Sequence, residues 1–79
     1  MVTVVMFATA RVAAGAGTGE FAGERVGDVL RAARDQYGPA FASILDHSRV
    51  WLNGEAVDSM DAPCVRGDEV AILPPVAGG

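Results

Sequence analysis

The chain has 79 residues, enough for one small domain and too few for a second core or a dinucleotide-binding domain. Its six basic residues, all arginines, are scattered along the chain, and the net charge is -4, which argues against binding to nucleic acid or to an anionic membrane surface. With 51% hydrophobic residues, a single cysteine and a single histidine, the domain must be stabilised by packing, because one chain contains neither a disulfide framework nor a zinc site.

Residues 2–8 are rich in β-branched and aromatic side chains and predict a strand at the centre of a sheet. A helical turn is expected over residues 9–14, with Thr9 as its N-cap, before three glycines between residues 15 and 19 end it. A short edge segment around Glu20 and Phe21 follows.

The apolar N-terminal stretch has the small residues of a secretory signal but lacks a basic segment before its apolar run. No run reaches the roughly 20 apolar residues of a membrane-spanning helix. We therefore expect a cytoplasmic protein with a reduced thiol.

A helix is predicted over residues 26–37, because apolar side chains recur at helical spacing while arginines and an aspartate occupy the other face. Gly38 is expected to be its left-handed C-cap and Pro39 to prevent continuation. A second short helix is expected over residues 40–45, with three of its apolar side chains facing the core, namely Phe41, Ile44 and Leu45.

The second half of the chain predicts a hairpin and a last strand. Residues 49–52 lead into Asn53-Gly54, a strong hairpin turn, and residues 55–57 form the returning strand. After a loop and a turn, residues 69–73 form the final strand, which Pro74-Pro75 ends.

These elements predict an α+β domain over residues 1–75, in which a mixed sheet of four to five strands packs on one main helix. Residues 76–79, here called the tail, are expected to be a flexible extension, because the two prolines favour an extended path.

Three candidate sites within the domain are interpreted as structural. His47 has no nucleophile at a recognisable spacing and is expected in a surface loop. Cys64 is expected to be a small buried hydrophobic side chain rather than a reactive thiol. The glycine-rich stretch of residues 15–19 lacks the lysine of a phosphate-binding loop and is expected to be a turn.

Gly78-Gly79 at the end of the chain is the feature that points to chemistry. Two residues without Cβ atoms fit a narrow channel and place an unhindered carboxylate in another protein's active site. Adenylation by ATP would make the Gly79 carbonyl carbon susceptible to a sulfur or amine nucleophile, so the protein would be a substrate rather than an enzyme.

Several stretches together resemble the ThiS/MoaD sulfur carriers of the ubiquitin-like β-grasp fold, over essentially the whole chain. They are the ending V-A-I-L-P-P-V-A-G-G, the R-G-D-E-V before it, the N-G turn and the opening V-V-M-F-A-T-A-R. The double proline and the F-A-x-x-R pattern are most similar to MoaD, the small subunit of molybdopterin synthase.

The resemblance implies a function without catalytic side chains or a bound cofactor. A MoeB-like, ubiquitin-activating-type adenylyltransferase would consume ATP to adenylate Gly79, and a persulfide donor would convert it to a thiocarboxylate. The tail would then enter a MoaE-like large subunit and give its sulfur to cyclic pyranopterin monophosphate in molybdenum cofactor biosynthesis.

Residue by residue, Gly79 matches the reactive terminus and Gly78 its slim neighbour. Four residues, Pro74, Pro75, Val76 and Ala77, match the extended segment that threads the partner. Phe7 and Leu73 match apolar positions on the partner-facing sheet, with ordinary core residues as the alternative interpretation.

Two positions depart from the family pattern: Arg25 replaces a threonine that caps the main helix, and Cys64 replaces a leucine. Alternative functions are a thiocarboxylate carrier for another pathway (cysteine, thiamin or a sulfur-containing metabolite), a ubiquitin-like protein modifier, and a small interaction module with an incidental tail. The acidic net charge predicts basic partner surfaces.

Overall fold

A computed structural model describes residues 1–75 of the chain. It contains five strands and three helices in the order β1 (Val2–Met6), α1 (Ala8–Ala14), β2 (Thr18–Phe21), α2 (Val26–Tyr37), α3 (Pro39–Asp46), β3 (Arg49–Leu52), β4 (Glu55–Ala56) and β5 (Glu69–Leu73). This is the predicted α+β architecture, a ubiquitin-like β-grasp, with all five strands in one sheet.

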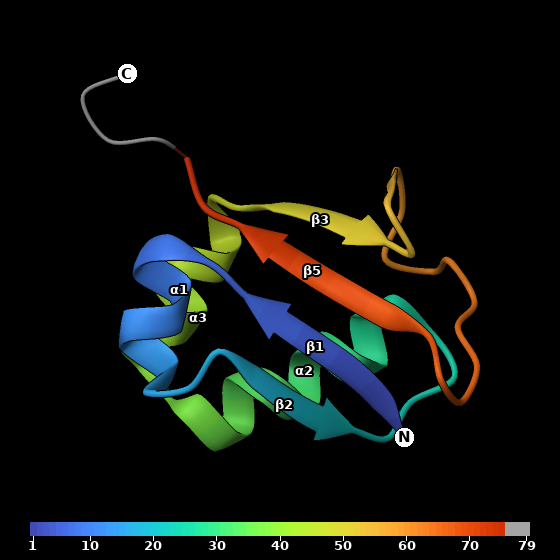
Figure 1. Cartoon of the computed structure of the whole chain (residues 1–79), viewed down its shortest axis with the longest axis horizontal. Coiled ribbons are helices and arrows are strands. Elements are labelled where there is room, and N and C mark those ends of the chain that lie inside the picture. Colours follow the sequence, from blue (N-terminus) through green and yellow to red (C-terminus); the bar gives the residue numbers. More distant parts are fainter. Residues whose placement is uncertain (76–79) are drawn as a thin grey trace.

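The strand order across the sheet is β2-β1-β5-β3-β4, so the last strand lies in the middle (Figure 1). β1 and β5 are parallel, and the other neighbours are antiparallel, which makes the sheet mixed as predicted. A parallel pair needs a crossover connection, and here it contains the helices.

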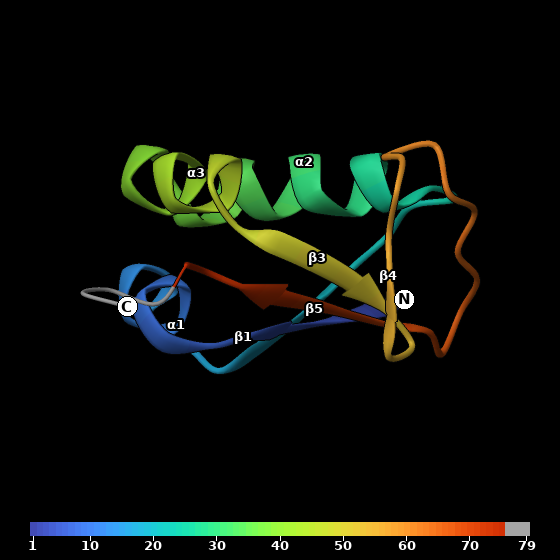
Figure 2. The ribbon, with the colours of Figure 1, turned by 90° about the horizontal axis from the view of Figure 1, so that it is seen from above.

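Helices α2 and α3 cover one face of the sheet, while α1 lies beyond the end of β1 at the level of the sheet (Figure 2). The strands alternate accordingly: Val2, Val4 and Met6 of β1 are buried against the helices, as are Val70 and Ile72 of β5. The helices contribute their apolar side chains to the core. The buried residues of α2 are Val26, Val29, Leu30 and Ala33, and those of α3 are Phe41 and Leu45. Among residues 1–75, no helix covers the opposite face of the sheet, which we call the open face (Figure 2).

The start of α1 differs from the prediction. The strand ends at Met6 rather than Ala8, and the N-cap of α1 is Phe7 rather than Thr9. The Phe7 carbonyl accepts the N–H groups of Ala10 and Arg11, so the turn begins two residues earlier. Ala8 turns the chain with φ 51°, a left-handed conformation that its residue type does not indicate.

Gly38 separates α2 from α3 in a conformation that also differs from the prediction. Its φ of 91° is positive, but its ψ of -175° is extended, so it is not a left-handed α C-cap. Pro39 is the first residue of α3, where its missing N–H costs nothing, and α3 therefore spans one residue more at each end than predicted.

Candidate functional site

The predicted reactive terminus, Gly79, lies outside the described residues, as do Val76, Ala77 and Gly78. The structure instead shows where the tail starts. Pro74 and Pro75 directly follow β5, the central strand, and Pro75 is exposed. Whatever docks around the tail therefore meets the end of β5 and its two neighbours, β1 and β3.

An exposed row of three side chains crosses the sheet at this end. Arg49 of β3 pairs with Leu73 of β5, and the register that pairs Met6 with Ile72 brings Phe7 beside Leu73. The Phe7 N–H donates to the Ile72 carbonyl at 3.3 Å, which continues the ladder. We call Phe7, Leu73 and Arg49 the tail-end row.

The side chains of the tail-end row are accessible to a partner. Phe7 is 47% exposed and Leu73 38% exposed, and Arg49 is exposed as well. The alternative interpretation of Phe7 and Leu73 as ordinary core residues is therefore wrong. Large apolar side chains exposed side by side are typical of interaction surfaces.

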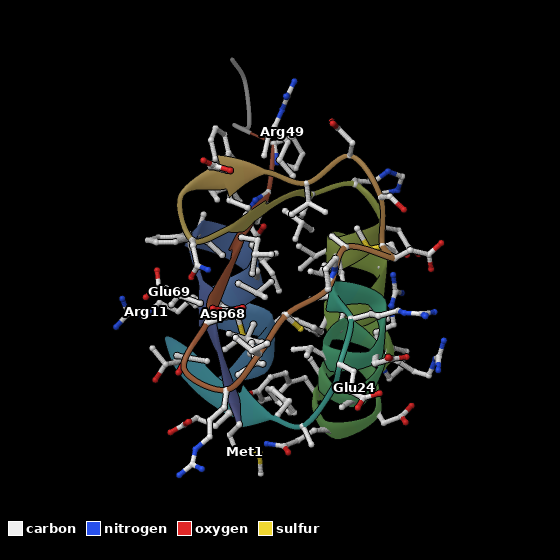
Figure 3. All side chains as sticks on the ribbon, turned by 90° about the vertical axis from the view of Figure 1, so that its right-hand side faces the viewer. Met1, Arg11, Glu24, Arg49, Asp68 and Glu69 are labelled. Carbon is white, nitrogen blue, oxygen red and sulfur yellow. The ribbon has the colours of Figure 1, made fainter. Side chains whose placement is uncertain are left out.

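The open face of the sheet changes in character away from the tail. Behind the tail-end row, the register aligns Val5, Ala71 and Trp51, all partly buried, in a second apolar row. At the far end Thr3 lies between Glu20 and Glu69. Figure 3 shows the Glu69 side chain directed away from α2 and α3. The face is thus apolar near the tail and acidic at the other end.

Arg49 and Trp51 did not stand out in the sequence. Successive side chains of a strand point to opposite faces of the sheet. Because Val50 and Leu52 pack against the core, Arg49 and Trp51 lie on the open face. Their position beside Leu73 depends on the β3–β5 register, which pairs strands about twenty residues apart.

Cys64 is buried, with an exposed fraction of 5%, as predicted. Burial raises the pKa of its thiol, and the negative charges of Asp68 and Asp28 raise it further. At neutral pH the side chain is therefore a neutral thiol and a poor nucleophile.

The remaining candidate sites in the domain also follow the structural interpretation. His47 is exposed at the end of α3. Gly15 ends α1 in the left-handed conformation with φ 74°. Residues 15–17 form the predicted turn, whereas Thr18 and Gly19 already belong to β2. Within residues 1–75, no three His, Cys, Asp or Glu side chains gather as a potential metal site.

A model of the ThiS family matches residues 4–79. The chain belongs to the ThiS family. Members of this family are small sulfur carriers with a ubiquitin-like fold, and such carriers are generally not catalytic by themselves.

Several solved structures resemble this ThiS family member over nearly its whole length. SAMP1 from Haloferax volcanii is 34% identical, with 99% of this chain and 98% of that chain covered and a TM-score of 0.84. The Amycolatopsis orientalis BexX/CysO complex contains a chain that is 26% identical, fully covered on both sides, with a TM-score of 0.85. A putative molybdopterin converting factor subunit 1 from Pyrococcus furiosus is 28% identical, with coverages of 95% and 97% and a TM-score of 0.79.

Among curated proteins, none matches this ThiS family chain. In the part of the chain that the structure describes, no helix is long and apolar enough to span a bilayer.

Proposed function

We propose that the protein carries sulfur as a thiocarboxylate on Gly79 and donates it, as the small subunit of a molybdopterin synthase, to cyclic pyranopterin monophosphate. The observation that carries the proposal is the position of Pro74 and Pro75, the two residues before the tail: they follow the central strand beside the exposed tail-end row. The similarity to a putative molybdopterin converting factor subunit 1 supports the choice of pathway.

The chain supplies a docking face and a carboxylate, and its partners supply the catalysis. A Gly79 carboxylate oxygen attacks the α-phosphorus of ATP in a MoeB-like enzyme, and pyrophosphate leaves. The outer sulfur of a donor persulfide then attacks the acyl carbon, and AMP leaves. A thiol then attacks the donor's sulfur in the resulting acyl disulfide. The thiol and the donor become joined in a new disulfide, and the thiocarboxylate is released. After sulfur transfer in a MoaE-like large subunit, hydrolysis of the acyl group restores the carboxylate.

The first experiment follows the mass of the intact protein after incubation with ATP, the activating enzyme and a persulfide source. We expect one oxygen to be replaced by one sulfur at the C-terminus, and no such change in a variant that lacks Gly79. Cys64→Ala is the matched control: it removes the only cysteine and should still be loaded. Absence of loading in the wild-type chain, or full activity without Gly79, contradicts the proposal.

The pathway is tested in a second step. The loaded protein is mixed with the large subunit encoded by the same genome and with cyclic pyranopterin monophosphate, and formation of molybdopterin is measured. Sulfur transfer to another acceptor, with none to the pterin, favours a carrier for a different pathway. The similarity to the BexX/CysO complex makes that outcome the main alternative among carriers.

A second candidate function is covalent protein modification, since SAMP1 of Haloferax volcanii is named a small archaeal modifier protein and is 34% identical to this chain. The chain contains no lysine, so it would be joined to lysines of other proteins rather than to copies of its own side chains. Adducts that survive denaturation and reductant, and that disappear without Gly79, would favour this function over a carrier.

A further inference from the structure

A hollow of about 290 Å³ lies beside the start of the tail. It forms where α3 ends and β3 begins, next to the end of β5. Its lining residues are His47, Arg49, Trp51, Leu73, Pro74 and Pro75. The last two directly precede the tail, so an occupant of the hollow also contacts the base of the segment that is proposed to enter the partner.

The lining contains a guanidinium that no carboxylate of residues 1–75 neutralises. Arg49 forms no ion pair among the described residues, whereas nearby Asp46 is held by Arg34 at 2.7 Å. Arg49 also lines a second hollow that includes Asp58, and the two side chains form no ion pair in the described structure. Figure 3 shows the Arg49 side chain extending outward from the body of the molecule.

The rest of the lining is mainly apolar and held by backbone structure. Trp51 is fixed by pairing with Ala56 on one side and Ala71 on the other, and Leu73 pairs with Arg49. The two prolines have restricted φ angles, so this wall changes shape less than an ordinary loop. Tryptophan and arginine are the side chains that most often dominate the binding energy of protein interfaces.

We propose that this hollow is the docking site of an acidic segment of the large subunit. In this arrangement a partner carboxylate pairs with Arg49, and an adjoining apolar side chain of the partner packs over Trp51 and Leu73. The inference rests on the proposed function, because it names the large subunit as the occupant. It also changes the expectation of basic partner surfaces: the charge that Arg49 places in the lining of the hollow is opposite in sign to the net charge of -4.

The test measures the Kd between the intact protein and the large subunit encoded by the same genome, for wild type and three variants. We expect Arg49→Glu to raise the Kd about tenfold or more, because it places the new carboxylate against the carboxylate of the partner. The Kd of Arg49→Lys should stay within about threefold of the wild-type value. Arg66→Glu is the matched control: it makes the same charge change on an exposed arginine in the turn before β5, at the other end of that strand, and should alter the Kd less than about twofold.

Salt dependence gives a second readout that a folding defect would not mimic. The wild-type Kd should rise with sodium chloride more steeply than that of an Arg49→Gln variant, because the neutral variant lacks the screened ion pair. Circular dichroism of each variant checks that the exposed substitution leaves the fold intact.

Failure of this inference is distinguishable from failure of the proposed function. If the large subunit binds wild type and all variants equally, the proposed function stands and the role of the hollow is overturned. If the wild-type chain does not bind the large subunit at all, the proposed function fails and the named occupant fails with it. If only the KM for adenylation by the activating enzyme depends on Arg49, that enzyme occupies the hollow and the proposal is also overturned.

Discussion

Asp68 joins two turns that are 15 residues apart in the sequence. One oxygen of its carboxylate accepts the Val65 N–H at 2.8 Å, and the other accepts the Asn53 side-chain amide at 3.0 Å. The side-chain Oδ1 of Asn53 in turn accepts the Glu69 N–H at 2.9 Å. The hairpin turn after β3 is therefore tied to the turn that precedes β5.

These hydrogen bonds predict a pH-dependent contribution to stability. The Val65 N–H, and after it the Asn53 amide, lower the pKa of Asp68 from its ordinary value of 3.8. Because the folded-state pKa is below the unfolded one, the contribution is present above pH 3.8 and is lost as the pH falls through the lowered pKa. Asp68→Ala should thus be less stable than wild type at pH 7, with a difference that shrinks below pH 3.8.

Urea unfolding at a series of pH values measures this difference. Asp61→Ala serves as the control, since the Asp61 carboxylate accepts no hydrogen bond from the described residues. A gap between Asp68→Ala and wild type that persists unchanged into strong acid would contradict the assignment.

Cys64 gives a second prediction at this scale. Because burial raises its thiol pKa and leaves only 5% of the residue exposed, the folded protein should be alkylated by iodoacetamide far more slowly at pH 7.5 than free cysteine. Unfolding in urea should restore the ordinary rate, as followed by intact mass. Fast labelling of the folded chain would show that the site opens readily.

Helix α2 begins without a side-chain cap, because Arg25 occupies the N-cap position. Backbone carbonyls of the loop between β4 and β5 replace it: the Ala62 carbonyl accepts the Val26 N–H at 2.9 Å, and the Met60 carbonyl accepts the Gly27 N–H at 2.8 Å. A Cβ on Gly27 would lie 3.1 Å from the Met60 carbonyl oxygen, so glycine permits this close approach.

The loop carbonyls lead to a prediction for Arg25→Thr. Restoring a capping threonine ordinarily adds about 1 kcal/mol, but here we expect less than about 0.5 kcal/mol, because the N–H groups of the first turn already have acceptors. Denaturant unfolding measures the change. A gain of the full ordinary size would show that the loop carbonyls are poor substitutes.

Elements with strong local patterns were predictable from the sequence. Residues 26–37, 49–52 and 69–73 have the observed bounds, since helical spacing, the Asn53-Gly54 turn and flanking prolines act locally. Asn53 and Gly54 indeed have φ of 50° and 84°, as a type I′ turn requires.

Elements that depend on tertiary contacts were less predictable. β2 is longer than expected because pairing with β1 recruits Thr18 and Gly19. Glycine is a weak strand former, and Thr18 stands between two glycines, so the local sequence favours a turn there. Gly19 also makes room for the Tyr37 hydroxyl, which a Cβ at this position would meet. The local sequence predicts neither the pairing with β1 nor the approach of Tyr37 to Gly19.

At the scale of the whole molecule, part of the candidate site was predictable from the sequence and part depended on tertiary structure. Composition and motif at the end of the chain pointed to the tail, and Phe7 and Leu73 followed from the family resemblance. Arg49 and Trp51 needed the order of the strands, which brings β3 beside β5. Hydrophobic periodicity identifies the outward side of a strand but does not identify its neighbour.

The open face predicts a separation between stability and binding. Phe7→Ser should lower the free energy of unfolding by no more than about 1 kcal/mol, because nearly half of the residue is already exposed. The same change should weaken binding of the large subunit, measured by titration calorimetry. Val65→Ser is the control, since Val65 is 66% exposed in the turn before β5, far along that strand from the tail. Equal effects of both changes on binding would contradict a docking role for the tail-end row.

The central position of β5 also bears on how the molecule matures. β1 and β3 do not pair with each other, because each pairs with β5. Residues 69–73 therefore join two parts of the sheet that come from distant parts of the chain. Such non-local pairing forms late and slowly compared with helices. A full-length chain in which β5 has not yet paired with β1 and β3 has no tail-end row, because that row requires all three strands. If the activating enzyme of the proposed function recognises this row, it would spend ATP only on molecules whose sheet is complete.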